Sequence, residues 1–187
     1  MLKRVFDVAA AAVGLLVLLA PLAGLWLLVR LTSPGPALYW SERVGRDSRL
    51  FSMPKFRTMR IDAPEVATHL LDDPDRWLTP MGNTLRRLSL DELPQLWSVL
   101  VGDMSLVGPR PALFNQDDLI AARATAGVDK LRPGVTGWAQ INGRDELSIP
   151  DKVALDAEYL ARRSFGFDLM VLLRTVAPVV TGRGVTR

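Results

Sequence analysis

Two adjacent carboxylates, Asp91 and Glu92, are the residues of this 187-residue chain with the clearest capacity for chemistry. They precede an apolar helical pattern, and basic residues occupy the segments around them. The candidate cations are Lys55, Arg57, Arg86, Arg87, Arg110, Arg132 and Arg144. Backbone N–H groups at a helix start and the forked guanidinium of arginine both bind phosphate oxygens. The pattern therefore predicts an anion site that takes a phosphorylated ligand.

A hard divalent cation would allow carboxylates and a phosphate to share one site. Mg²⁺ takes one or two carboxylates together with phosphate oxygens, so we predict Asp91 and Glu92 as its ligands. A carboxylate held beside a phosphorus atom can also act as a nucleophile and form an acyl phosphate. A second interpretation stays open, because acidic residues often begin helices only to cap N–H groups and balance the helix dipole.

Composition excludes several other kinds of site. The chain has no cysteine and one histidine, His69, so a thiolate nucleophile and Cys-ligated or His-rich metal sites are excluded. No P-loop, GxGxxG, HExxH or GxSxG motif occurs. The formal net charge of +3 favours an anionic small molecule or membrane surface over a nucleic-acid partner.

The N-terminal segment is long and apolar enough to enter a membrane. Residues 8–29 carry no charge, and as a helix they would extend about 33 Å. This run is too long for a typical cleaved signal peptide. Basic residues lie on both sides of it, and Pro21 near its middle predicts a kink. A straight span and a re-entrant helix that returns to the same side both remain open.

The rest of the chain predicts a small α+β domain that is mainly helical. We expect a membrane segment over residues 1–33 and a catalytic domain over 34–187. Residues 37–44 and 50–59 flank a polar turn and predict a β-hairpin. Ser89 and Glu92 match a capping box before an apolar stripe, which predicts a helix within 85–100. Further helices are expected over 115–126, 149–163 and 165–180, the last either buried or lying along a membrane face.

Three long blocks, taken in order, resemble the bacterial sugar transferases, which are monotopic phosphoglycosyl transferases. These blocks are KFRTM at 55–59, SLDELPQLWSVLVGDMSLVGPRP at 89–111 and LRPGVTGWAQINGR at 131–144. The resemblance covers essentially the whole chain. It implies a re-entrant membrane helix, a short hairpin and a small catalytic domain with interfacial amphipathic helices at the cytoplasmic face of the inner membrane. The family's kink is often at Ser-Pro, whereas this chain has Ala20-Pro21.

The resemblance also implies a reaction and its substrates. A sugar 1-phosphate would pass from a nucleoside diphosphate sugar, usually a UDP-sugar, to a polyprenyl phosphate such as undecaprenyl phosphate, with release of UMP. This would be the first membrane step in the synthesis of a surface glycan. Asp91 matches the family's nucleophile, Glu92 completes the pair, and Mg²⁺ would neutralise the diphosphate.

Several further residues would bind the substrates by the same resemblance. They are Lys55, Arg57, Arg86, Arg110, Trp138, Gln140, Asn142 and Arg144. Two rival functions remain at this point. One is a membrane-anchored, Mg²⁺-dependent phosphohydrolase of nucleotide sugars that uses the same Asp91 intermediate with water as acceptor. The other is a non-catalytic, membrane-tethered interaction module in which Asp91 and Glu92 only cap a helix.

Overall fold

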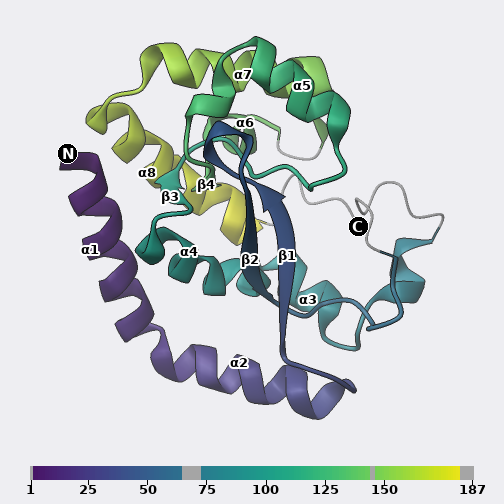
Figure 1. The fold of residues 1–187 in the computed structure, drawn as a ribbon. Coiled ribbons are helices and arrows are strands. Elements are labelled where there is room, and N and C mark those ends of the chain that lie inside the picture. Colours follow the sequence, from purple (N-terminus) through teal and green to yellow (C-terminus); the bar gives the residue numbers. More distant parts are fainter. Residues whose placement is uncertain (1, 65–72, 144–145, 182–187) are drawn as a thin grey trace.

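The computed structural model describes residues 2–64, 73–143 and 146–181. The chain is mainly helical, with about 59% of residues in helices, and contains a short antiparallel hairpin. Figure 1 shows the hairpin in the middle of the molecule, with helices α1 and α2 along one border and α5 and α7 at the opposite end. The expected combination of helices and one hairpin is therefore confirmed.

The N-terminal apolar segment forms two helices rather than one. Helix α1 (Leu2–Val17) and helix α2 (Leu19–Thr32) meet at an angle of 63°. Pro21 explains the position of the bend, because it has no N–H for the carbonyl of Val17 and its ring crowds that carbonyl. Within the described residues, no unbroken helix has the length and hydropathy to cross a bilayer, whereas the bent pair together reaches that length.

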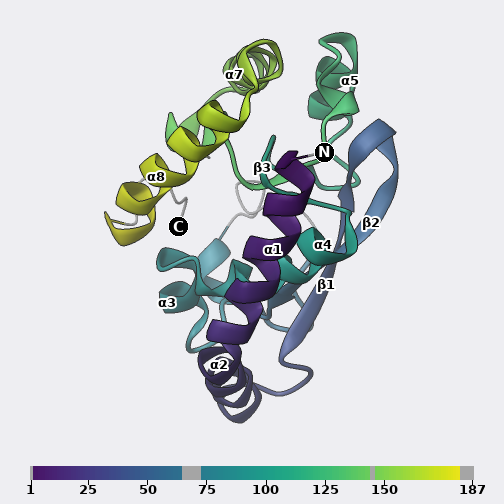
Figure 2. The same ribbon diagram turned by 90° about the vertical axis from the view of Figure 1, so that its left-hand side faces the viewer.

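The start of α1 is bound to the rest of the protein by polar contacts. Arg4 donates hydrogen bonds to the carbonyls of Val99 at 2.7 Å and Leu100 at 3.1 Å, near the end of α4 (Leu96–Val101). The buried Asp7 accepts a bond of 2.8 Å from the Ser105 hydroxyl. Figure 2 shows α1 crossing in front of α4 before the chain turns into α2. The first helix is therefore integrated with the domain that carries the acidic pair.

The hairpin agrees with its predicted place in the sequence. Strand β1 (Leu38–Val44) pairs antiparallel with β2 (Leu50–Phe56), with Tyr39 opposite Lys55 and Ser41 opposite Met53. These four side chains share one face of the sheet because paired residues project to the same side. Met53 packs into a core cluster with Val99, so the same face directs Lys55 towards the segment that carries Asp91.

The helix predicted within residues 85–100 is divided, and its predicted cap is wrong. The segment forms α3 (Gly82–Arg87), a 3₁₀ helix η4 (Leu90–Gln95) and then α4. Ser89 has a positive φ of 54° and makes no side-chain capping bond. Pro94, inside η4, cannot donate the backbone bond that a regular α-helix would need. Asp91 and Glu92 therefore lie in a tight 3₁₀ turn and not at a capped α-helix start.

A second, parallel pair of strands was not predicted from the sequence. Strand β3 (Ser105–Val107) pairs with β4 (Gly134–Thr136), and the glycines there permit very close packing. A Cβ added at Gly137 would lie 2.0 Å from the Gly108 carbonyl oxygen. This packing joins residues 108–111, which we call the GPRP loop, to the sequence block that begins at residue 131.

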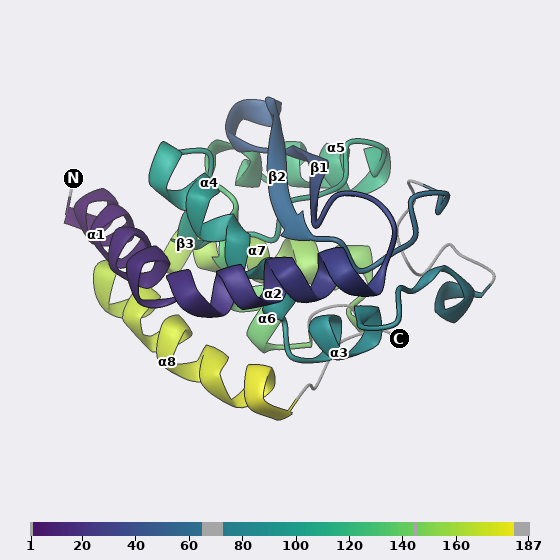
Figure 3. The same ribbon diagram turned by 90° about the horizontal axis from the view of Figure 1, so that it is seen from below.

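The last helices complete the domain, and all of them except the short α6 (Trp138–Ile141) follow the predicted pattern. They are α5 (Asp117–Thr125), the one-turn α6, α7 (Ile149–Arg162) and α8 (Phe165–Thr181). One face of α8 is buried, at Val171, as one of the two predictions for this helix required. Leu173, on another face, is 77% exposed. Contact of that exposed face with a membrane stays a prediction. Figure 3, seen from below, shows α1 and α2 end to end across the front of the molecule, with α8 along the neighbouring edge.

Candidate active site

A cavity of about 430 Å³ opens between the hairpin, η4 and the segment from Arg110 to Leu119. This volume is within the range of sites for small organic ligands. The described lining residues include eight basic side chains and three acidic ones. The basic residues are Arg43, Lys55, Arg57, Arg60, Arg86, Arg110, Arg123 and Lys152, and the acidic ones are Glu42, Asp91 and Glu92. This excess of positive charge suits a ligand with several phosphate charges.

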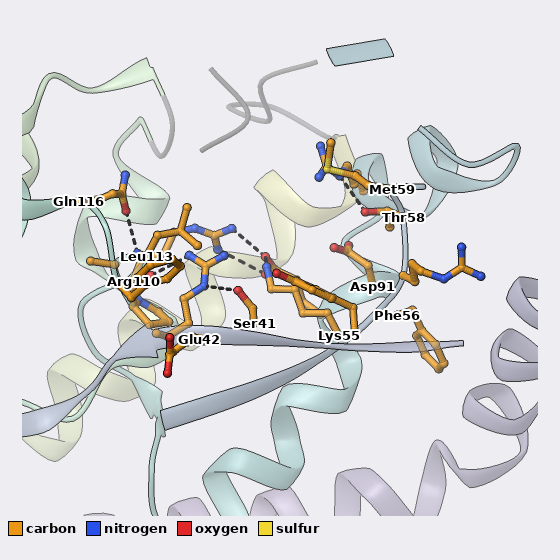
Figure 4. A pocket seen from close by; sticks show the side chains of 18 of the residues that line it. Ser41, Glu42, Lys55, Phe56, Thr58, Met59, Asp91, Arg110, Leu113 and Gln116 are labelled. Carbon is orange, nitrogen blue, oxygen red and sulfur yellow. Dashed lines mark hydrogen bonds and ion pairs between the residues drawn. The ribbon is translucent and has the colours of Figure 1, made fainter. Parts of the chain in front are cut away.

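Asp91 lies at the centre of this cavity and is only 6% exposed. Figure 4 shows its carboxylate between Lys55 and Thr58, directed away from the strands. Among the described residues, no group donates a hydrogen bond to it. Burial and the neighbouring charge of Glu92 raise the pKa of Asp91 to about 6, against the lowering effect of Lys55, Arg86 and Arg110. At neutral pH the carboxylate is therefore ionised, and no hydrogen bond from the described residues reduces its nucleophilicity.

Glu92 is held in a different way from its neighbour. Its Oε1 accepts a bond of 2.8 Å from Arg110 Nη2, and it lies 3.4 Å from Lys55 Nζ. Burial lowers the pKa of Lys55 to about 8, although the charge of Glu92 acts in the opposite direction. Glu92 thus orients two cations beside Asp91, while Asp91 itself stays available for chemistry.

Two of the predicted phosphate ligands are anchored by residues that flank the hairpin. Arg86, at the end of α3, donates from Nε to the Thr58 hydroxyl at 3.0 Å. Arg57 donates from Nε to the Pro36 carbonyl at 2.6 Å and from Nη2 to the Ser33 carbonyl at 3.1 Å. Both side chains line the cavity, but Arg57 also connects the end of α2 to the hairpin.

Three lining arginines, Arg43, Arg60 and Arg123, were missed by the sequence analysis. Arg43 lies on β1 and donates from Nε to the Ser41 hydroxyl at 2.8 Å and from Nη1 to the Pro111 carbonyl at 3.2 Å. Arg123 on α5 pairs with the buried Asp156 at 2.6 Å and donates to the Arg110 carbonyl at 2.7 Å. The even spacing of Arg43 from Tyr39 and Ser41 on a predicted strand was a usable signal for Arg43. Arg123 gave none, because it looks like an ordinary polar residue of a helix.

Residues 137–144, with the sequence GWAQINGR, contribute fewer described residues to the cavity than the sequence analysis predicted. Gln140 lines the cavity and donates to the Val135 carbonyl at 3.0 Å, while its buried Oε1 has no partner among the described atoms. Trp138 instead donates to Glu158 at 2.8 Å and packs on Phe167. Asn142 is exposed and caps α6 through the Trp138 carbonyl.

The described lining residues therefore include Lys55, Arg57, Arg86, Asp91, Glu92, Arg110 and Gln140 from the predicted set. Trp138 and Asn142 do not line the cavity within the part of the chain that is described. Arg144 and His69 lie outside the described residues.

The donor set fits a magnesium ion only in combination with a ligand. Within the described residues, no cluster of three or more acidic or histidine side chains could hold a metal alone. Asp91 and Glu92 supply the one or two carboxylates that Mg²⁺ takes when phosphate oxygens and water complete its coordination. The ion would neutralise charge on a bound diphosphate, and Asp91 has the less occupied carboxylate.

Comparison with known proteins gives consistent results along the whole chain. A family profile described as bacterial sugar transferase matches residues 1–182. The chain is 45% identical, over 96% of its length and 70% of the relative's, to the UDP-glucose:undecaprenyl-phosphate glucose-1-phosphate transferase of Caulobacter vibrioides. It is 42% identical to the uncharacterized sugar transferase EpsL of Bacillus subtilis, over 98% and 90% of the two chains. It is 38% identical to the exopolysaccharide production protein ExoY of Rhizobium meliloti, over 98% and 88%.

Proposed function

This chain belongs to the bacterial sugar transferase family, and we propose that it transfers a sugar 1-phosphate from a UDP-sugar to undecaprenyl phosphate in the synthesis of a surface glycan. The observation that carries this proposal is the buried Asp91 carboxylate, which has no hydrogen-bond donor among the described residues and faces a cavity rich in cations. The names of two relatives, from Caulobacter vibrioides and Rhizobium meliloti, support the acceptor and the exopolysaccharide context.

The reaction proceeds in two displacements at one phosphorus atom. An Asp91 Oδ attacks the phosphorus that carries the sugar, the bond from that phosphorus to the bridging oxygen breaks, and UMP leaves with the oxygen. The product on the enzyme is an acyl phosphate that bears the sugar. An oxygen of the lipid phosphate then attacks the same phosphorus, which regenerates the Asp91 carboxylate and gives a polyprenyl diphosphate sugar.

The surrounding side chains support charge changes at that phosphorus. Lys55 and Arg110 carry positive charge beside Asp91, and Glu92 holds both in place. Cations fixed in a partly buried site stabilise the developing charge without reorganisation. When Mg²⁺ binds with the substrate, it would neutralise further charge on the diphosphate.

The arrangement of α1 and α2 supports a re-entrant membrane segment whose two ends lie at the cytoplasmic side. Arg4 at the start of α1 and Ser33 after α2 are both bonded to the catalytic body. Exposed apolar side chains gather around the bend, at Leu16, Val17 and Leu19. The polar anchors at both ends and the apolar bend between them fit a segment that enters and leaves the membrane on one side.

Thiol labelling tests this topology. The chain has no cysteine, so a single thiol introduced at either exposed end of the helix pair, as Leu2→Cys or Pro34→Cys, is labelled without background from other residues. We expect both variants to react with an impermeant reagent only from the cytoplasmic side of oriented vesicles. Labelling of the two positions from opposite sides would contradict this topology.

The test of the reaction is UMP release by the purified chain with several UDP-sugars and Mg²⁺, with and without undecaprenyl phosphate. Lipid-dependent release that chelation abolishes is the expected result. Full-rate release without lipid would indicate a hydrolase, and no release together with no nucleotide binding would indicate an interaction module.

The covalent step has its own measurement. Donor without lipid should add the mass of one phosphosugar to the protein, and the modified peptide should contain Asp91. The Asp91→Asn variant is the control and should gain no mass. Modification of another residue would contradict Asp91 as the nucleophile.

A further inference from the structure

The cavity has two chemically different ends on either side of Asp91. We call the α5 end the part lined by Arg43, Arg110, Leu113, Phe114 and Gln116, and the α2 end the part lined by Pro36, Arg57 and Ile61. Figure 4 shows Gln116, Leu113 and Arg110 on one side of Lys55, with Thr58 and Met59 on the other. A substrate with two unlike halves could therefore place one half at each end.

The α5 end contains two guanidinium groups, those of Arg43 and Arg110, which repel each other electrostatically. Burial, and next the positive charge of Arg110, lower the pKa of Arg43 to about 10. Glu92 already pairs with Arg110 and Lys55, and Asp91 is its neighbour in the chain. The two carboxylates do not balance the charge of the three cations Arg43, Arg110 and Lys55. An additional anion bound here would therefore relieve the mutual repulsion of these cations.

Both arginines are oriented before any ligand binds. Arg43 is held by the Ser41 hydroxyl and the Pro111 carbonyl, and the backbone of Arg110 is held by Arg123. A backbone bond of 3.0 Å from Val44 to Ala112 connects β1 to the GPRP loop. Pre-oriented donors of this kind lose little entropy when they bind a phosphate.

The surface next to the two arginines suits a planar, polar base. Phe114 is 38% exposed at the cavity edge. Gln116 accepts a bond of 2.9 Å from the Leu113 N–H through Oε1, which fixes its amide and leaves Nε2 to donate to a carbonyl. An aromatic ring for stacking and an amide donor are the two features with which proteins bind unpaired bases.

The other end of the cavity adjoins the membrane segment. Arg57 there is bonded to Ser33, directly after α2, and Phe56 packs in a cluster with Val29 of α2. An apolar helix beside this end suits a lipid phosphate, whose hydrocarbon chain lies in the membrane, and offers no favourable contact to a soluble nucleotide.

We propose, on the basis of the sugar transferase function above, that the α5 end is the subsite for the nucleoside monophosphate half of the donor. Arg43 and Arg110 bind the phosphate that becomes the leaving group, Phe114 stacks on the base, and Gln116 donates to a base carbonyl. Arg43, Phe114 and Gln116 are thereby binding residues for the donor.

Direct binding of UMP and of inorganic pyrophosphate to the purified full chain separates these roles. Phe114→Ala should weaken UMP binding about tenfold and leave pyrophosphate binding unchanged, because only UMP carries a base. Arg43→Gln should weaken both ligands on the order of tenfold, because both carry phosphate. Leu50→Ala removes an exposed apolar side chain that does not line the cavity and should change neither.

Two results would overturn the subsite. One is wild-type UMP affinity in Phe114→Ala, and the other is an equal loss of pyrophosphate affinity in that variant. If Phe114→Ala does not fold, as judged by circular dichroism, Gln116→Ala serves in its place with the same expectations. Lipid-dependent UMP release by the wild type is measured on the same preparation. Its absence counts against the transferase function, whereas its presence with unaltered UMP binding in the variants counts against the subsite alone.

Discussion

Replacing Asp91 with asparagine should abolish turnover while making the folded protein more stable. The folded-state pKa of Asp91, about 6, exceeds its ordinary value of 3.8 because of burial and the charge of Glu92. The folded protein therefore binds this proton more tightly than the unfolded chain, and ionisation destabilises the fold. This destabilisation of the fold by the ionised carboxylate is absent below about pH 4, grows as the pH rises and is complete above about pH 6.

The size of this effect follows from the same values. The interval from 3.8 to about 6 corresponds to about 3 kcal/mol of free energy of unfolding at neutral pH. Asparagine removes the charge but leaves a buried amide without partners, which costs about 1 kcal/mol or more. We expect a net stabilisation of about 1–2 kcal/mol, or a rise of about 4 °C in Tm.

Asp156→Asn is a matched control, because it makes the same chemical change at another buried aspartate. Burial raises the pKa of Asp156 as well, but Asp156, unlike Asp91, accepts bonds from Arg123 at 3.0 and 2.6 Å. Removing its charge leaves the buried Arg123 guanidinium without its anion, and this cost exceeds the gain from removing a buried charge. That variant should lose about 3 kcal/mol. Thermal unfolding at pH 7.5 and UMP release are measured for both variants. The reasoning is refuted if Asp91→Asn keeps wild-type turnover, or if it lowers the Tm as Asp156→Asn does.

Three further perturbations test other parts of the structure. The pH profile of kcat/KM should fall below about pH 6, as Asp91 is protonated, and above about pH 8, as Lys55 loses its charge; a flat profile from pH 5 to 7 would exclude Asp91 as the titrating base. Pro21→Ala should reduce the 63° bend and lengthen the distance between spin labels at Leu2→Cys and Thr32→Cys, and an unchanged distance would show that the proline does not cause the bend. Gly137→Ala should prevent stable folding, because its Cβ would lie 2.0 Å from the Gly108 oxygen. Gly24→Ala, inside α2 with nothing within 4 Å of the added Cβ, should not lower the Tm and should raise it slightly, because alanine favours the helix.

Local sequence patterns correctly predicted the elements whose formation depends mainly on residues close to one another in the sequence. The hairpin follows from two short apolar runs around a polar turn, and its strands lie within one to three residues of the expected bounds. The helix over 149–163 follows from its periodicity and the last one from its apolar run, whereas the Ser148 side chain that caps α7 was not used as a signal. The bend of the N-terminal segment follows from Pro21, because a missing N–H acts on the carbonyl four residues before it.

The same reasoning failed where a distant part of the chain competes with a local preference. Ser89 and Glu92 satisfy a capping pattern, yet Glu92 bonds to Arg110 and Lys55 instead. Trp138 lies in a block with the signature of a binding site, but its indole packs between α7 and α8. In both cases the side chain's partner comes from a segment that local spacing does not show.

The sequence by itself indicated the family of this chain and the acidic pair with its surrounding cations, because residue types, their order and the three long blocks are local properties of the chain. It also determined that the N-terminal segment is apolar, and Pro21 predicted a kink there. The tertiary structure alone decided that Asp91 is left without hydrogen-bond donors among the described residues while Glu92 is neutralised, and that Arg43 and Arg123 belong with the site. These outcomes depend on which side chains contact one another across the cavity. Such contacts arise from packing between segments that are far apart in the sequence.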